Sequence, residues 1–161
     1  MAAFLKFNKF SQSLVQGLCG DMEGADVKFA LTNTAPAAPT TQTVFDVGGL
    51  HPPPAEAHGY TSGGHSATIS GSAETGGVYT YATTTDVVIT AAGGTIGPFR
   101  YVILYVNAGT LPLIGYWDYL SSITLQVGET FTILSRGWQP PPWGCLLDGE
   151  HPGPGRRQYS I

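Results

Sequence analysis

The residues best suited to chemistry in this chain lie in one loop-like stretch. It holds three histidines and one glutamate, side chains that can bind zinc: His51, Glu56, His58 and His65. Their spacing matches no established metal motif, and neither cysteine of the chain lies nearby. Solvated loop histidines explain the pattern better, so we expect neither a metal nor another cofactor.

A hydroxyl group lies close to an imidazole in the same stretch, where Ser62 precedes His65 by three residues. Nucleophilic catalysis by this pair would need an acidic residue that orients the histidine, and the stretch supplies none in that pattern. The motifs HExxH, CxxC, GxSxG and the P-loop are absent. We therefore expect no enzyme, and a small hydrolase that uses Ser62 or His65 is the third alternative.

Two aromatic residues and a carboxylate are adjacent at Tyr116, Trp117 and Asp118. Aromatic rings stack on sugars and a carboxylate accepts hydrogen bonds from hydroxyls, so this trio is a candidate glycan-binding site. In a strand, Trp117 and Tyr119 would face the core and Asp118 the opposite side beside Tyr116. Packing inside the sheet is the competing interpretation, because buried aromatic rings contribute strongly to small β domains.

The scaffold for these residues is the stretch Gly97–Ile133, which holds the most apolar surface of the chain. Residues 101–106 are apolar on both alternating faces, which predicts a central strand buried on both sides. A second strand is expected over residues 113–119, and two shorter β runs should follow it.

The remaining elements are expected to be short. A helix over residues 9–18 is predicted by the apolar stripe of Phe7, Phe10, Leu14 and Leu18, with Asn8 as its N-cap and Gly20 as its stop. Further strands are predicted at residues 27–31, 44–47, 67–70, 78–82 and 86–90. Paired glycines separate several of these runs, as at tight turns. The pattern is typical of a mainly β fold, an antiparallel β-sandwich or jelly roll with one short N-terminal helix.

The composition divides the chain into a β-sandwich domain at residues 1–135 and a Pro/Gly-rich C-terminal arm at residues 136–161. Proline lacks the backbone donor that a sheet interior requires, so the arm is expected to be extended. It would order by laying Trp138 and Trp143 onto a partner or onto its own sandwich. The Pro-rich connection over residues 36–58 is either a second arm or a surface loop.

Charge is sparse, at 11% of residues with a net charge of −4. Phosphate binding needs clustered Lys and Arg, so we expect no nucleic-acid partner. Arg156 and Arg157 are the only adjacent pair of basic residues. Arg100 precedes the central strand, and we expect it to pair with Asp118 or Asp86.

The sequence also predicts a cytoplasmic site of synthesis. Cys19 and Cys145 lie far apart in different contexts, which favours two free thiols in a reducing compartment. The first residues lack the apolar core of a signal peptide, and no apolar run has the length of a membrane span. We therefore expect no membrane partner.

Several local phrases resemble a group of small structural proteins of tailed bacteriophages. They span residues 4 to 133: Phe4–Asn8, Val27–Pro36, Gly59–Gly64, Ile96–Tyr101, Leu113–Tyr119 and Gly128–Phe131. In such proteins the last strand would continue into a short polar β ending. Here the chain turns at Leu134 into the Pro-rich arm, which fits either a lineage-specific arm or a change of reading frame near that residue.

The resemblance implies a virion structural protein, a capsid decoration (cement) protein on the outer surface of the head, made in the host bacterial cytoplasm. Its implied partners are the major capsid protein and itself, as a homotrimer, and it has no active site. The expected capsid or subunit contacts are Phe4, Phe7, Pro52, Pro53, Pro54, Trp138, Pro141, Trp143, Arg156 and Arg157. The alternative is a tail or fibre component that binds host glycans through Tyr116, Trp117 and Asp118.

Overall fold

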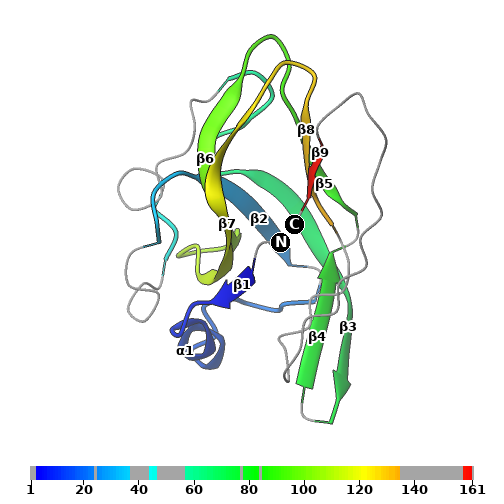
Figure 1. Ribbon diagram of the computed structural model, residues 1–161. Helices are drawn as coiled ribbons and strands as arrows, with labels where there is room; N and C mark the ends of the chain where they lie inside the picture. Colours follow the sequence, from blue (N-terminus) through cyan, green and yellow to red (C-terminus); the bar gives the residue numbers. More distant parts are fainter. Residues whose placement is uncertain are drawn as a thin grey trace.

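The computed structural model describes residues 3–23, 25–36, 44–46, 57–76, 78–83, 85–134 and 158–160. Over these ranges the protein is mainly β with one short helix, which confirms the predicted fold class (Figure 1). The elements are β1 (Ala3–Lys6), α1 (Phe10–Val15), β2 (Asp26–Thr32), β3 (His65–Thr75), β4 (Val78–Thr83), β5 (Val87–Thr90), β6 (Ile96–Val106), β7 (Leu113–Leu125), β8 (Thr130–Ile133) and β9 (Gln158–Ser160).

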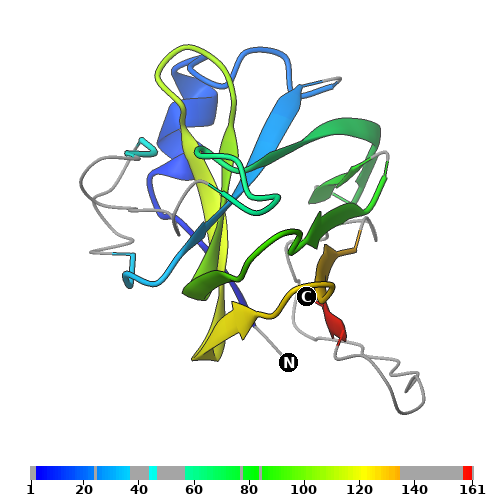
Figure 2. The ribbon, with the colours of Figure 1, turned by 90° about the horizontal axis from the view of Figure 1, so that it is seen from above.

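The strands form a sandwich-like pair of sheets. The larger sheet has six strands in the order β1-β7-β6-β2-β3-β4, and every neighbouring pair is antiparallel. The smaller sheet has the order β5-β8-β9, in which β9 runs parallel to β8. The larger sheet is curled, and its long strands β6 and β7 lie side by side (Figures 1 and 2).

Strand β6 is the centre of the fold, as the sequence predicts. All six of its residues from Tyr101 to Val106 are buried. Val102, Leu104 and Val106 belong to the main core, which also includes the buried residues of β5 and β8. Tyr101, Ile103 and Tyr105 belong to a second, smaller core on the other face of the sheet. A strand with apolar side chains on both faces is therefore covered on both faces.

The smaller core is closed by a segment from the long connection. Phe45 is buried there and stacks on Tyr105, with ring centroids 4.1 Å apart and planes at 8°. The backbone N–H of Phe45 donates to the carbonyl of Leu111 at 2.9 Å, and Val44 forms an isolated bridge with Pro112. The predicted strand at residues 44–47 is thus a single bridge over its described part.

The turn before β3 is fixed by two tyrosine hydroxyls. The buried Tyr60 hydroxyl accepts a hydrogen bond from the backbone N–H of Leu31 at 2.9 Å, and burial raises the pKa of Tyr60 to about 12. The hydroxyl of Tyr105 donates to the carbonyl of Gly63 at 2.6 Å. Both bonds join residues 60–64 to the sheet, and they satisfy backbone groups that would otherwise be left without partners.

The N-terminal helix is shorter than predicted, and its predicted apolar stripe is confirmed at Phe7 and Phe10 but wrong at Leu14 and Leu18. The helix covers Phe10–Val15, with Lys9 rather than Asn8 at the N-cap position, and Gly17 at φ +70° lies just beyond its end. Its buried residues are Phe10 and Ser13. The side chains expected to continue the stripe are exposed instead, by 36% at Leu14 and 40% at Leu18. The helix is so short that only its first turn reaches the core.

Strand β7 is longer than predicted because a bulge interrupts its alternation. Asp118 is opposite Tyr101 and Ile123 is opposite Phe99, so β7 advances five residues where β6 advances two. The extra residues include Leu120, which is 71% exposed with φ +67°. Sequence alternation breaks at such a bulge, so one strand looks like two separate β runs.

Candidate binding surface at the β6–β7 bulge

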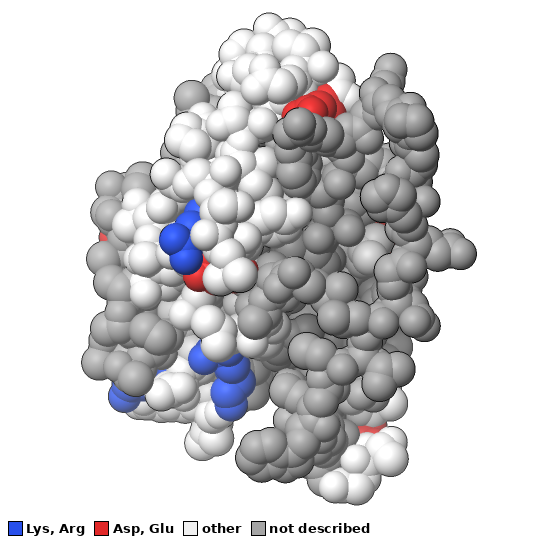
Figure 3. Space-filling view, in the orientation of Figure 1, with Lys and Arg blue, Asp and Glu red and all other residues white. Residues whose placement is uncertain are grey.

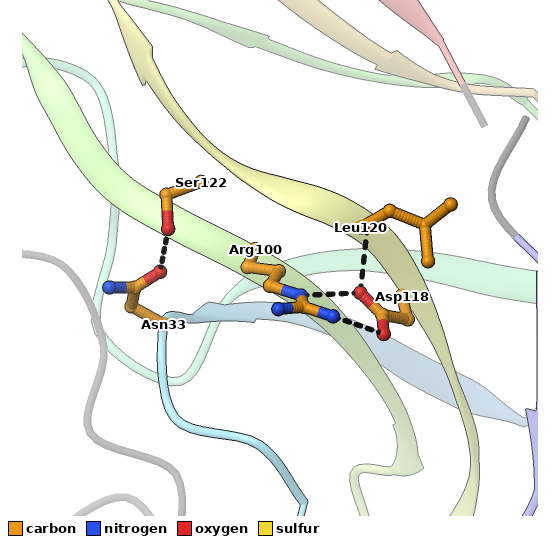
Figure 4. Close-up of polar contacts among 5 residues, drawn as sticks. All are labelled: Asn33, Arg100, Asp118, Leu120 and Ser122. Atoms are coloured by element: carbon orange, nitrogen blue, oxygen red, sulfur yellow. Dashed lines mark hydrogen bonds and ion pairs between the residues drawn. The ribbon is translucent and has the colours of Figure 1, made fainter.

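The bulge presents an ion pair between the two central strands. Arg100 donates to Asp118 twice, from Nε to Oδ1 at 2.7 Å and from Nη2 to Oδ2 at 2.8 Å (Figure 4). Of the two predicted partners of Arg100, the structure therefore selects Asp118. The reason is the register, because Asp118 is opposite Tyr101, the residue that follows Arg100 on β6.

Asp118 also fixes the backbone of the bulge. Its Oδ1 accepts a hydrogen bond from the backbone N–H of Leu120 at 2.8 Å (Figure 4). A leucine in the left-handed region costs about 1–2 kcal/mol, so this conformation must be held by its surroundings. The carboxylate supplies one such restraint. A second lies at Ser122, whose hydroxyl donates to Oδ1 of Asn33 at 2.7 Å.

The charges of the pair stabilise each other. The hydrogen bonds from Arg100 hold the pKa of Asp118 below its ordinary value, with a smaller contribution from the Leu120 N–H. The same pairing raises the pKa of Arg100. The guanidinium carbon also lies 5.1 Å from the ring centroid of Tyr101, within range of a cation–π contact. Both oxygens of the Asp118 carboxylate are thus engaged within the chain.

The predicted glycan trio does not form one surface. Tyr116 is buried in the smaller core, with its ring 5.3 Å from that of Phe7. Trp117 lies on the opposite face of the sheet, where its ring centroid is 4.8 Å from that of Phe4 and 6.0 Å from that of Phe29. The expected division of faces is therefore present, but it separates the aromatic rings that a sugar would need together.

Two of the predicted contact residues lie in the described structure, and they differ in exposure. Phe7 is fully buried, so its side chain is already committed to the chain's own core. Phe4 is half-buried on β1, with its ring directly over Gly115. The other predicted contacts lie outside the described residues: Pro52, Pro53, Pro54, Trp138, Pro141, Trp143, Arg156 and Arg157.

A second candidate surface was not predicted from the sequence, which placed Leu14 and Leu18 on a buried stripe and gave Val15 no role. It consists of Leu14, Val15 and Leu18, which we call the helix patch. Their exposed fractions are 36%, 89% and 40%. Leu14 and Val15 belong to the last turn of α1 and Leu18 follows in the turn after it, so the three exposed apolar side chains come from one short segment. The patch lies at the end of the molecule formed by α1 (Figure 1).

Few charges surround these surfaces. In Figure 3 most of the described surface on the face shown is uncharged, with basic atoms in small separate groups. Near the helix patch, Lys9 donates from Nζ to Oε1 of Gln12 at 2.9 Å, and Lys6 donates to Oγ of Ser11 at 3.3 Å. Two lysines therefore lie close in sequence to the apolar side chains of the helix patch.

The histidines do not gather into a site within the part of the chain that the structure describes. His58 is exposed, while His65 is partly buried on β3 with its ring 5.9 Å from that of Tyr60. His51 and Glu56 lie outside the described residues. Within the described ranges no group of three or more His, Cys, Asp or Glu side chains could hold a metal ion.

No known protein family, curated protein sequence or solved structure matches this chain. None of the described residues belongs to a helix that is long and apolar enough to cross a membrane.

Proposed function

We propose that this protein is a structural component of a tailed-bacteriophage particle, a head decoration protein that bridges neighbouring major capsid proteins. The sequence phrases that resemble such proteins support this role, and so does a mainly β fold with few charges. A decoration protein stabilises a shell by binding only its assembled form, which shifts the equilibrium toward assembly.

The observation that carries the proposal is the helix patch. Leu14, Val15 and Leu18 leave three apolar side chains exposed within one short segment of the chain. Adjacent exposed apolar side chains mark contact with another protein more often than scattered ones do. An N-terminal contact element is also what the resemblance implies, although Phe7 is buried and the helix patch takes the place expected for it.

The glycan-binding alternative receives less support from the geometry. The ring of Tyr116 is buried, and the carboxylate of Asp118 is engaged by Arg100 and by the Leu120 N–H. A sugar would find neither a pair of exposed rings nor a free carboxylate at this place.

The helix patch can be tested by binding to particles that lack the protein. We expect the double variant Val15→Ser/Leu18→Ser to keep its circular dichroism spectrum and to bind the shell at least about tenfold more weakly, a loss of about 1.4 kcal/mol. Val127→Ser is the matched control, because Val127 is also an exposed apolar residue, at 64%. Equal binding by the double variant and the control would contradict the assignment of the patch.

A further inference from the structure

The last strand of the chain is attached to the fold in an unusual way. β9 contains only three residues, and it pairs in parallel with β8 through Thr130↔Gln158, Phe131↔Tyr159 and Thr132↔Ser160. The pairing fills the edge of β8 that β5 leaves open. An open strand edge offers unpaired N–H and C=O groups to any extended segment.

The acceptor strand belongs firmly to the body of the molecule. Phe131 of β8 is fully buried, and its ring lies 5.2 Å from that of Phe99 and 6.3 Å from that of Tyr119. β8 also pairs with β5 over four residues. The acceptor is therefore a preformed edge, whereas β9 pairs with β8 through three residue pairs in the described part of the chain.

The connection between the two strands is much longer than their pairing requires. To lie parallel to β8, the chain must return from Ile133 to the level of Thr130, a distance of about 10 Å along the strand. The sequence places residues 134–157 between the strands, and a chain of that length can span up to about 80 Å. A connection of this length within a small domain is usually either functional or a linker. It also contains five prolines, which favour extended backbone.

We propose that the β8 edge is an acceptor for the β9 strand of a second copy of this chain, so that neighbouring copies are joined by exchange of their C-terminal strands. The same three backbone pairs form within a chain and between chains, and strand exchange of this kind is a low-cost route to an oligomer. Whether β8 pairs with its own β9 or with the β9 of a second copy therefore depends on local concentration rather than on new contacts.

The concentration at which exchange competes follows from the tether. A strand on a tether has an effective concentration in the millimolar range, so free chains should exchange as their own concentration approaches about 1 mM. Copies held side by side on a larger assembly would reach that range at any bulk concentration. The inference concerns contact between copies and does not depend on the capsid role, so either can fail without the other.

The exchange can be tested by crosslinking two different full-length chains. One chain carries Thr132→Cys, and a second chain with a size tag carries Ser160→Cys, at the register partner of Thr132. Both carry Cys145→Ser, whereas Cys19 is kept because it is buried and burial raises the pKa of its thiol. A short bismaleimide joins the chains only where these two positions lie together.

A control measures the heterodimer yield that random collision produces. In this control, a tagged chain that carries Thr75→Cys, an exposed position on β3, replaces the Ser160→Cys chain. We expect the Thr132/Ser160 heterodimer to exceed the control by about tenfold as the chains approach about 1 mM. Heterodimer yields equal to the control at every concentration would overturn the proposal. A single chain with both Thr132→Cys and Ser160→Cys that crosslinks only within monomers at about 1 mM would also overturn it.

Light scattering on the unsubstituted protein gives an independent measurement. We expect its average mass to rise above the monomer value of 16.9 kDa over the same concentration range. A chain that stays monomeric up to about 1 mM would contradict the exchange even if a cysteine variant failed to fold.

Discussion

At the scale of single residues, Gly64 shows how closely the turn before β3 approaches the sheet. Gly64 has φ +89°, and a Cβ there would lie 2.6 Å from the carbonyl carbon of Phe29 and 2.7 Å from Cα of Ala30. Both contacts are backbone atoms of β2, which cannot move aside without disturbing the central sheet. Only glycine therefore fits this position.

Alanine substitution tests the role of Gly64. We expect Gly64→Ala to lower the free energy of unfolding by at least about 2 kcal/mol more than Gly76→Ala, because steric overpacking adds to the cost of a positive φ. Gly76 is the matched control, since it has φ +61° with no atom within 4 Å of its Cβ position. Urea unfolding curves measure both, and equal losses would show that the approach to Phe29 imposes no constraint.

His65 is a partly buried titratable group that lacks a hydrogen-bond partner at one ring nitrogen. Its Nε2 is buried without a hydrogen-bond partner, and burial lowers the pKa of the imidazole, opposed in part by a hydrogen bond to the Gly59 backbone. As the pH falls below the ordinary value of 6.5, the unfolded chain takes up a proton that the folded chain resists. The contribution of His65 to stability is therefore complete above that value and declines as the pH drops toward the lowered pKa of the folded state.

The pH dependence of unfolding tests this account of His65. For one proton the free energy of unfolding changes by at most about 1.4 kcal/mol per pH unit. We expect His65→Gln to remove part of the decline below pH 6.5 that the unsubstituted protein shows. An identical decline in the His65 variant would assign it to other groups.

At the scale of elements, strands with clear alternation could be predicted from the sequence alone. The predicted ranges 27–31 and 86–90 fall within one residue of β2 and of the start of β5. The central strand and its two apolar faces are also confirmed. These elements could be read because their side-chain pattern follows directly from burial on the faces of a sheet.

Other elements depend on tertiary structure that a sequence pattern does not contain. The predicted apolar stripe is wrong at Leu14 and Leu18, because the exposed leucines of the helix patch look the same in sequence as buried ones. The bulge in β7 depends on the positive φ of Leu120, a backbone conformation that a leucine in the sequence does not predict. β9 was missed because three residues are too few to show a period.

The candidate site, too, could be predicted from the sequence only in part. Asp118 was singled out because it lies among aromatic residues, and Arg100 because basic residues are rare and it precedes the central strand. Their pairing followed from the register once the strands were placed. The contribution of Asn33 could not be foreseen, because it lies 89 residues from its partner Ser122 and only the folded sheet brings them together.

At the scale of the whole molecule, the fold combines a firmly packed sheet with two features directed outward. The helix patch lies at the α1 end, and the acceptor edge of β8 belongs to the smaller sheet (Figure 1). One feature suits a different protein and the other suits a second copy. A protein with both could join its own copies while each copy attaches to a shell.

The central claim is the location of this protein on a phage particle, and a cryo-electron microscopy reconstruction of that particle tests it most directly. The account predicts β-rich density that fits the two sheets on the outer surface of the head, with α1 against the major capsid protein. Density for this chain in the tail or its fibres, or none in the particle, would contradict it.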